Sequence, residues 1–223
     1  MAIHPTQRDD LRHAQDVALA VKDRGSDEFH VGLIFRDERR NFRLLHLADQ
    51  RDLRNGAPSI DYLWVDIQGM DGFTAQRAAT ACRAVWELYE KEGLPYSVAE
   101  APEFQDDFSL SNEGPGVGFT CTTFVMRVLE QRGIILLDED TWRARPGDQA
   151  WRDKVIRYIR EQHHDERHAE MMQQKQGPFR FQPLDIVAAA LGSTIATFDE
   201  IEERLPEVRR RIMENQETEG TDE

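Results

Sequence analysis

The chain has 223 residues, 39% of them hydrophobic, so it is long enough for one hydrophobic core or a core with a helical appendage. Its net charge of −14 argues against a nucleic acid or an anionic membrane surface as the main partner. Only two cysteines occur, Cys82 and Cys121, so no disulfide framework is implied. The N-terminus lacks the apolar core of a signal peptide, and no apolar run approaches the roughly 20 residues that span a bilayer. We therefore expect a cytoplasmic protein without an integral membrane segment, unless export uses a route that leaves no such signal.

The first third of the chain combines one expected helix with three expected strands. Residues 14–21 predict a short helix. Runs rich in β-branched and aromatic residues predict strands over 29–36 and 42–48, joined by a charged turn, and a third strand over 62–67. These strands are expected to form a small antiparallel sheet.

Two helices dominate the middle of the chain. Between 74 and 92 apolar residues recur at helical spacing, and Cys82 lies on that stripe, which predicts a thiol packed in the core. A loop over 101–118, rich in Pro, Gly, Asn and acidic residues, leads to a second helix that starts at Cys121. Residues 134–137 fit either a short strand or a buried connection.

The second half is predicted to be helical. One amphipathic helix covers 151–159 and fades into a polar, charged run, and a short helix covers 184–191. Residues 197–200 have the pattern of a capping box, which opens a helix that resumes after Pro206. The acidic residues from Glu214 onward predict a disordered tail.

The sequence thus predicts four parts in chain order. They are an N-terminal segment with a short helix, a core, a helical extension packed on the core, and the acidic tail. Their expected bounds are 1–27, 28–140, 141–213 and 214–223.

The segment around Cys121 is the most informative stretch of the sequence. A glycine-rich lead-in, Gly116-Val117-Gly118, places this cysteine at the first turn of a helix. A thiol there feels the positive end of the helix dipole, which favours the thiolate over the thiol. The sequence therefore makes Cys121 a candidate nucleophile.

Two histidines lie on the first two expected strands. His30 and His46 are symmetric about residue 38, so a hairpin that turns on residues 37–39 places them directly opposite each other. Opposed residues share one face of a sheet, with Cβ atoms roughly 5 Å apart. Gly32 on the same face leaves room for another backbone or a substrate. A slip of one residue would place the two rings on opposite faces.

These three side chains suit nucleophilic catalysis by cysteine. His30 is expected to act as the general base for Cys121, and His46 to hold the ring of His30 in one tautomer and orientation. Asp49 or Gln50 at the strand end could compete with His46 for that second role. The backbone N–H of Cys121 is expected to contribute to an oxyanion hole, whose second donor the sequence does not locate.

Residues 28–135 resemble the permuted branch of the papain-like thiol hydrolases, the NlpC-type group that includes the lecithin–retinol acyltransferase-like proteins. Their pattern is His-x-Gly-Ile/Leu on a strand, a second His on the next strand, and later a Cys-x-x-Phe-Val helix. The matching residues are 30–33, His46 and 121–125. The acyltransferases have Asn before the cysteine, where this chain has Thr120.

This resemblance implies an α+β fold, in which a small antiparallel sheet packs on the Cys121 helix and further C-terminal helices cover one side. It implies cleavage of an amide, in a peptide or isopeptide substrate, through a thioester on Cys121. Acyl transfer and removal of ubiquitin-like modifiers are alternatives on the same permuted fold. A non-catalytic interaction protein built on this scaffold is the third hypothesis.

Other polar clusters are interpreted without a ligand. His164 and His168 share a helix face but lack the His-Glu-x-x-His pattern of zinc proteases, and a solvated helix explains them better. The glycines at 114–118 lack the Gly-Lys-Ser/Thr ending of a phosphate loop, and a flexible entry to the next helix is a sufficient explanation. No metal or cofactor is therefore expected, and the oligomeric state stays open.

Overall fold

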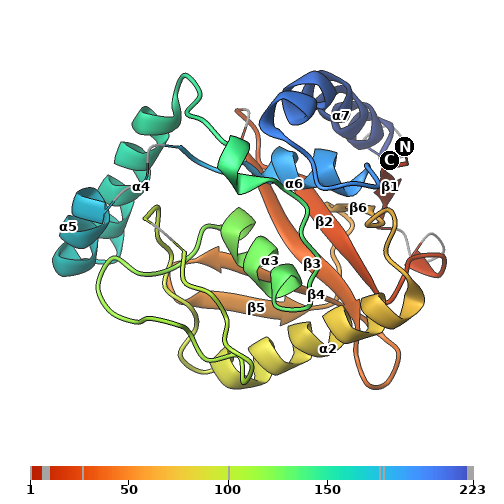
Figure 1. Ribbon diagram of the computed structural model, residues 1–223, viewed down its shortest axis with the longest axis horizontal. Helices are drawn as coiled ribbons and strands as arrows, with labels where there is room; N and C mark the ends of the chain where they lie inside the picture. Colours follow the sequence, from red (N-terminus) through yellow and green to blue (C-terminus); the bar gives the residue numbers. More distant parts are fainter. Residues whose placement is uncertain are drawn as a thin grey trace.

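A six-stranded antiparallel sheet with helices packed around it forms the protein, as the computed structural model shows (Figure 1). The strands are ordered β1-β6-β2-β3-β4-β5. Their bounds are β1 His4–Pro5, β2 Val17–Asp23, β3 Phe29–Arg36, β4 Phe42–Asp49, β5 Asp52–Gly56 and β6 Leu63–Val65. The structure describes residues 2–6, 11–26, 28–99, 101–175, 177 and 179–219.

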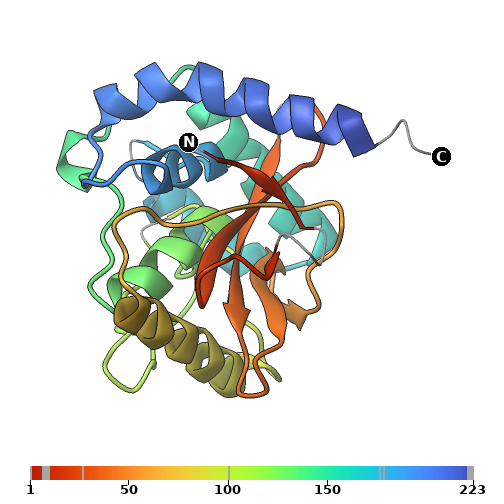
Figure 2. The same cartoon turned by 90° about the vertical axis from the view of Figure 1, so that its right-hand side faces the viewer.

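Six α-helices and one short 3₁₀ helix occur among these described residues. They are α2 Gly72–Tyr89, α3 Cys121–Glu130, η1 Glu139–Thr141, α4 Asp148–Gln162, α5 Glu166–Lys175, α6 Pro183–Ala190 and α7 Phe198–Glu219. Helices α2, α3 and α6 lie on one side of the sheet and bury the main hydrophobic core against it (Figure 2). The α+β class and the packing of the Cys121 helix on an antiparallel sheet are thus as predicted.

The short helix predicted over residues 14–21 is wrong, because residues 17–21 belong to strand β2 and residues 14–16 are not helical. Strand β2 pairs with β6 and β3 along its two edges, and both of its faces are also buried. Val17, Leu19 and Val21 face the main core, whereas Ala18 and Ala20 belong to a second hydrophobic cluster on the other face. A strand buried on both faces loses the polar–apolar alternation that distinguishes it from a buried helix. The predicted boundary at residue 28 consequently runs through the sheet.

The predicted register of the β3–β4 hairpin is wrong by two residues. Arg36 pairs with Phe42 and Leu33 with Leu45, so the turn is centred on residue 39 instead of 38. The Asp37 N–H donates to the Asn41 carbonyl at 2.8 Å, and Arg40, the last residue of the three-residue loop, adopts φ +64°. Three-residue hairpin loops commonly end in such a left-handed residue. Because side chains alternate with period two, a two-residue shift keeps the two histidines on one face.

Several other expectations on elements need correction. Strand β5 was not predicted. The charged helix expected to carry His164 and His168 occurs as α5, but α5 begins at Glu166 and so contains only His168. Residues 134–137 are a connection with a single bridge from Leu137 to Ala196. Helix α7 begins at the predicted capping box, where Thr197 and Glu200 bond each other, and it continues through Pro206.

The predicted tail differs from the structure, whereas the helices expected after residue 140 are present. Helix α7 continues to Glu219, so the prediction of disorder from Glu214 is wrong up to that residue, and residues 220–223 lie outside the described part. Side chains of α6 belong to the same hydrophobic core as the sheet. None of the described helices is long and apolar enough to cross a membrane.

Candidate active site

Cys121 is the first residue of α3, as predicted. Thr120 precedes it in an extended conformation and caps the helix, because its hydroxyl accepts from the Thr123 N–H at 3.1 Å. The Thr123 hydroxyl in turn accepts from the Thr120 N–H at 2.8 Å. This reciprocal capping box fixes the first turn of α3 and with it the position of the sulfur.

The glycine-rich lead-in is packed and not a flexible entry, which corrects the prediction. A Cβ atom on Gly118 would lie 2.3 Å from the Pro95 carbonyl oxygen, and one on Gly116 would lie 2.7 Å from the Met171 side chain. Gly116 also has φ +82°, which favours glycine. The glycines therefore allow close approach of neighbouring backbone and of α5 to the segment before Cys121.

His168 supports the same segment, although the sequence suggested a solvated helix there. Its side chain is buried, its Nδ1 accepts from the Gly116 N–H at 2.9 Å, and its Nε2 lies 2.9 Å from the Tyr96 carbonyl oxygen. The carbonyl can only accept, so Nε2 carries the proton and the ring is neutral. A neutral, buried imidazole thus links α5 to the two loops beside Cys121.

The two predicted histidines meet directly. The His30 Nε2 and His46 Nδ1 atoms are 2.8 Å apart, and the rings meet edge to face. Tyr62 packs near both rings on the same sheet face. Asp49 and Gln50 bond other groups, Tyr158 and the Tyr96 N–H, so neither competes for His30.

Gly32 makes this pairing possible. A Cβ atom at position 32 would lie 2.7 Å from the Cβ of His46 and 2.9 Å from the Leu45 carbonyl oxygen. The open space that the sequence predicted beside the histidines is therefore occupied by His46 and its strand, and not by a substrate. His30 reaches His46 diagonally across the hairpin, which long or aromatic side chains can do.

Both imidazoles are neutral near pH 7. Burial, and then the charge of His46, lower the pKa of His30 from 6.5 to about 3. Burial and the charge of Arg54 lower the pKa of His46 to about 4, against the opposite effect of Asp52. A neutral His30 whose Nε2 is paired with His46 retains Nδ1 as its second ring nitrogen.

The thiol of Cys121 is not the preformed thiolate that the helix position suggested. Burial raises the pKa of Cys121, and a hydrogen bond from the Val31 backbone opposes that rise. Val31 follows His30 on β3, so the sulfur meets the strand next to the histidine. Among the described residues, no hydrogen bond joins the sulfur to either imidazole. The resting site thus contains a neutral thiol near a neutral histidine pair.

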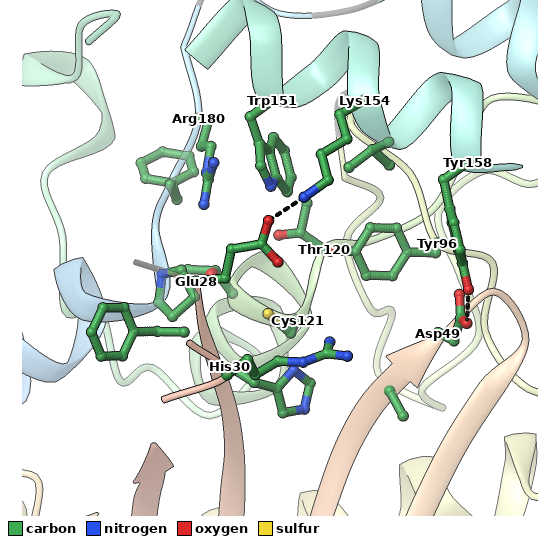
Figure 3. A pocket seen from close by; sticks show the side chains of 17 residues that line it. Glu28, His30, Asp49, Tyr96, Thr120, Cys121, Trp151, Lys154, Tyr158 and Arg180 are labelled. Atoms are coloured by element: carbon green, nitrogen blue, oxygen red, sulfur yellow. Dashed lines mark hydrogen bonds and ion pairs between the residues drawn. The ribbon is translucent and has the colours of Figure 1, made fainter. Parts of the chain in front are cut away.

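Cys121 and His30 line one cavity of about 280 Å³. Figure 3 shows Trp151, Lys154 and Tyr158 of α4 on one side of this cavity and His30 on the other, with the Cys121 sulfur between them. The remaining lining residues are Arg24, Glu28, Phe29, Ala48, Asp49, Tyr96, Thr120, Thr122, Val155, Arg180, Phe181 and Pro183. The walls therefore come from the sheet, from α3 and from the helical second half.

The charged residues of the cavity were not foreseen. Lys154 forms an ion pair with Glu28, and Tyr158 donates to Asp49 at 2.5 Å. Arg180 lies over the Trp151 ring, 3.8 Å from its centroid. These residues come from segments 28–49, 151–158 and around 180, and only packing brings such distant segments together. Trp151 lines the cavity, whereas Trp142 is a core residue.

Cys82 behaves as predicted. It is fully buried in α2 within the main core, and burial raises its pKa to about 12.

Within the described part of the chain, no three His, Cys, Asp or Glu side chains gather in a way that could hold a metal ion. Comparison of the chain with protein-family models, curated proteins and solved structures found no match.

Proposed function

We propose that the protein is a cysteine-dependent hydrolase that cleaves an amide bond, in a peptide or isopeptide, through a thioester on Cys121. The observation that supports this most is the 2.8 Å contact between His30 and His46 at the edge of the cavity that Cys121 also lines. The pair leaves one nitrogen of a neutral His30 free to accept a proton. This is the arrangement that a general base and its orienting partner need.

In the proposed reaction the Cys121 sulfur attacks the substrate carbonyl while its proton passes to Nδ1 of His30. His46 Nδ1 accepts the hydrogen bond from the Nε2–H of His30 and keeps that tautomer in place. The Cys121 N–H, which has no partner within its own helix turn, stabilises the oxyanion. Cleavage of the C–N bond returns the His30 proton to the leaving amine, and water then hydrolyses the thioester to the acid and the free thiol.

The chain order of the site supports the same proposal. A histidine strand, a second histidine strand and then a cysteine helix resemble the permuted papain-like group, whose cysteine acts as nucleophile. The chemistry proceeds from a neutral thiol, because burial raises the pKa of Cys121. We therefore propose that proton transfer accompanies attack and is not completed beforehand.

Acylation by an activated ester tests the function directly. With p-nitrophenyl acetate we expect one equivalent of p-nitrophenolate to be released in a burst, and an acetyl group to appear on Cys121 by peptide mass spectrometry. Cys121→Ser should abolish the burst, and His30→Gln should slow it by about 100-fold or more. Cys82→Ser is the matched control and should keep the burst, because Cys82 is fully buried.

Two outcomes would contradict the proposal. Acetyl groups on other residues, with none on Cys121, would mean that the cysteine is not a nucleophile. Equal rates for the wild type and His30→Gln would mean that His30 is not its base. Either result would favour an interaction protein on the same scaffold, which the missing sulfur–imidazole hydrogen bond also fits.

The fate of the acyl group separates hydrolysis from acyl transfer. Adding a primary amine to the acylated enzyme should leave the released acid as the main product if water is the acceptor. A product that becomes mostly amide at millimolar amine would identify an acyltransferase. Cleavage of an amide bond directly after a Gly-Gly sequence would point to a ubiquitin-like modifier as the acyl portion.

A further inference from the structure

Arg180 is a half-buried cation in the wall of the proposed active site. Its guanidinium lies over Trp151, and its Nε is buried without a hydrogen-bond partner. Among the described residues, no carboxylate forms an ion pair with it. The Trp142 indole N–H donates to the Arg180 carbonyl oxygen at 3.2 Å, which anchors the backbone of this segment. Arg180 is thus held in place, and no carboxylate among the described residues neutralises its charge.

Both carboxylates that line the cavity already have partners among the other lining residues. Glu28 pairs with Lys154, and Asp49 accepts from Tyr158 at 2.5 Å. Three cations and two carboxylates line the cavity, the third cation being Arg24, so its net charge is +1. The whole chain carries −14, which makes a positive cavity unusual on this molecule. A net charge of +1 matches a ligand with one negative charge.

Arg180 lines a second cavity as well as the first. A second cavity of about 340 Å³ shares Thr120, Trp151, Arg180 and Phe181 with the first. Its other walls combine apolar side chains with charged ones, which are Val98, Ala99, Ala101, Phe179, Arg127, Glu139, Arg152 and Lys175. In Figure 3, Arg180 and Trp151 enter from the side opposite His30, with the Cys121 sulfur between. A substrate attacked at Cys121 can therefore extend past Arg180 into the second cavity.

We propose that Arg180, stacked on Trp151, binds a free carboxylate of the substrate close to the bond that Cys121 cleaves. The substrate class is then an amide that carries one carboxylate, either a peptide α-carboxylate or an acidic side chain. A planar guanidinium binds a carboxylate through two parallel hydrogen bonds, and stacking on an indole keeps its edge free to do so. This inference takes the position of the reacting bond from the proposed function. Binding of the carboxylate to Arg180 does not depend on that function.

Binding to an inactive protein tests the carboxylate site. In Cys121→Ser, calorimetric titration should show N-acetylalanine or N-acetylisoglutamine binding at least about tenfold more tightly than neutral N-acetylalaninamide. The first ligand carries an α-carboxylate and the second a side-chain carboxylate, so the tighter one identifies the source. Adding Arg180→Met should remove the preference, and Arg180→Lys should keep only part of it. Arg157→Met, which removes an exposed charge on α4 outside the cavity, should change nothing.

Each other outcome overturns the inference. Equal binding of acid and amide, or no binding of either, would show that Arg180 does not select a carboxylate. Tighter binding of inorganic phosphate than of both carboxylates would identify a phosphate site instead. A preference that survives Arg180→Met, in a variant with an unchanged circular dichroism spectrum, would place the anion elsewhere.

A second readout on the wild-type chain separates this inference from the proposed function. Cys121 should react faster with iodoacetate than with iodoacetamide, and Arg180→Met should reverse that order. Carboxylate binding in the absence of any acyl-enzyme would overturn the catalytic proposal alone. An acyl-enzyme with no preference for carboxylates would overturn the role of Arg180 alone.

Discussion

At the scale of single residues, burial decides the chemistry of the site. His30, His46 and Cys121 are each held in the neutral form, because removing a charge from water costs more than the nearby groups return. The helix dipole at the start of α3 acts in the opposite direction, but it is worth only about 0.3–1 kcal/mol at exposed sites. Residue types alone therefore do not predict the protonation states of these three side chains.

The depressed pKa of His30 makes stability depend on pH. Its pKa is about 3 in the folded protein and 6.5 in the unfolded chain, so the unfolded state alone binds a proton between these values. The contribution of the neutral His30 to folding stability is complete above pH 6.5 and is lost as the pH falls towards 3. We expect it to supply about 1.4 kcal/mol per pH unit to the slope of the unfolding free energy between pH 6 and 4.5.

Urea unfolding at several pH values measures this slope. His30→Gln should flatten it by about that amount per pH unit, whereas His13→Gln, at an exposed position, should leave it unchanged. An identical slope in the wild type and His30→Gln would show that His30 titrates normally in the folded protein.

At the scale of elements, the β3–β4 hairpin positions the histidine pair. The strands approach closely at Gly32, where the side chain and carbonyl of the neighbouring strand fill the space that a Cβ would need. The glycine thereby lets His46 cross towards His30. The pairing of the two imidazoles is a property of this strand pair as well as of the two histidines.

Gly32→Ala tests this dependence. The added methyl group must displace His46 or the Leu45 backbone, and we expect a loss of about 1–3 kcal/mol in unfolding free energy together with slower acylation of Cys121. Gly56→Ala on β5 is the matched control, because no heavy atom lies within 4 Å of its Cβ position. Similar stabilities and acylation rates for the two variants would contradict the role of Gly32.

At the scale of the whole molecule, the second half of the chain completes both the core and the cavity. Leu184, Ile186 and Val187 of α6 are buried in the core that the sheet and α3 share. Trp151 and Arg180 supply the far wall of the cavity. We therefore expect the part after residue 140 to fold as one unit with the part before it.

Truncated chains test whether residues 1–140 can fold without the residues that follow. A chain that ends at residue 140 should fail to fold, because it exposes the core side chains that α6 covers, and each large one is worth about 1.5–3 kcal/mol. Circular dichroism and dispersion of amide NMR signals measure this. A chain that ends at Met213 keeps Val208 and Ile212 in the core and should fold. A well-dispersed spectrum for the shorter chain would show that residues 1–140 are an independent domain.

The sequence alone located the three side chains of the site because their local signals are strong. A capping Thr120 places Cys121 at the start of a helix, and the spacing of His30 and His46 keeps them on one face even when the register is two residues off. These features depend on neighbours along the chain, and so a single sequence contains them.

Only the tertiary structure decided the rest. Strand β2 gave a misleading pattern because both of its faces are buried, and the helices α2 and α6 that pack on one face are distant in sequence. The pKa of Cys121 depends on how completely water is excluded, which no local pattern encodes. Arg180 joins the site across about sixty residues of chain because α4 and α6 pack around the cavity, and long-range packing of this kind is fixed only by the fold.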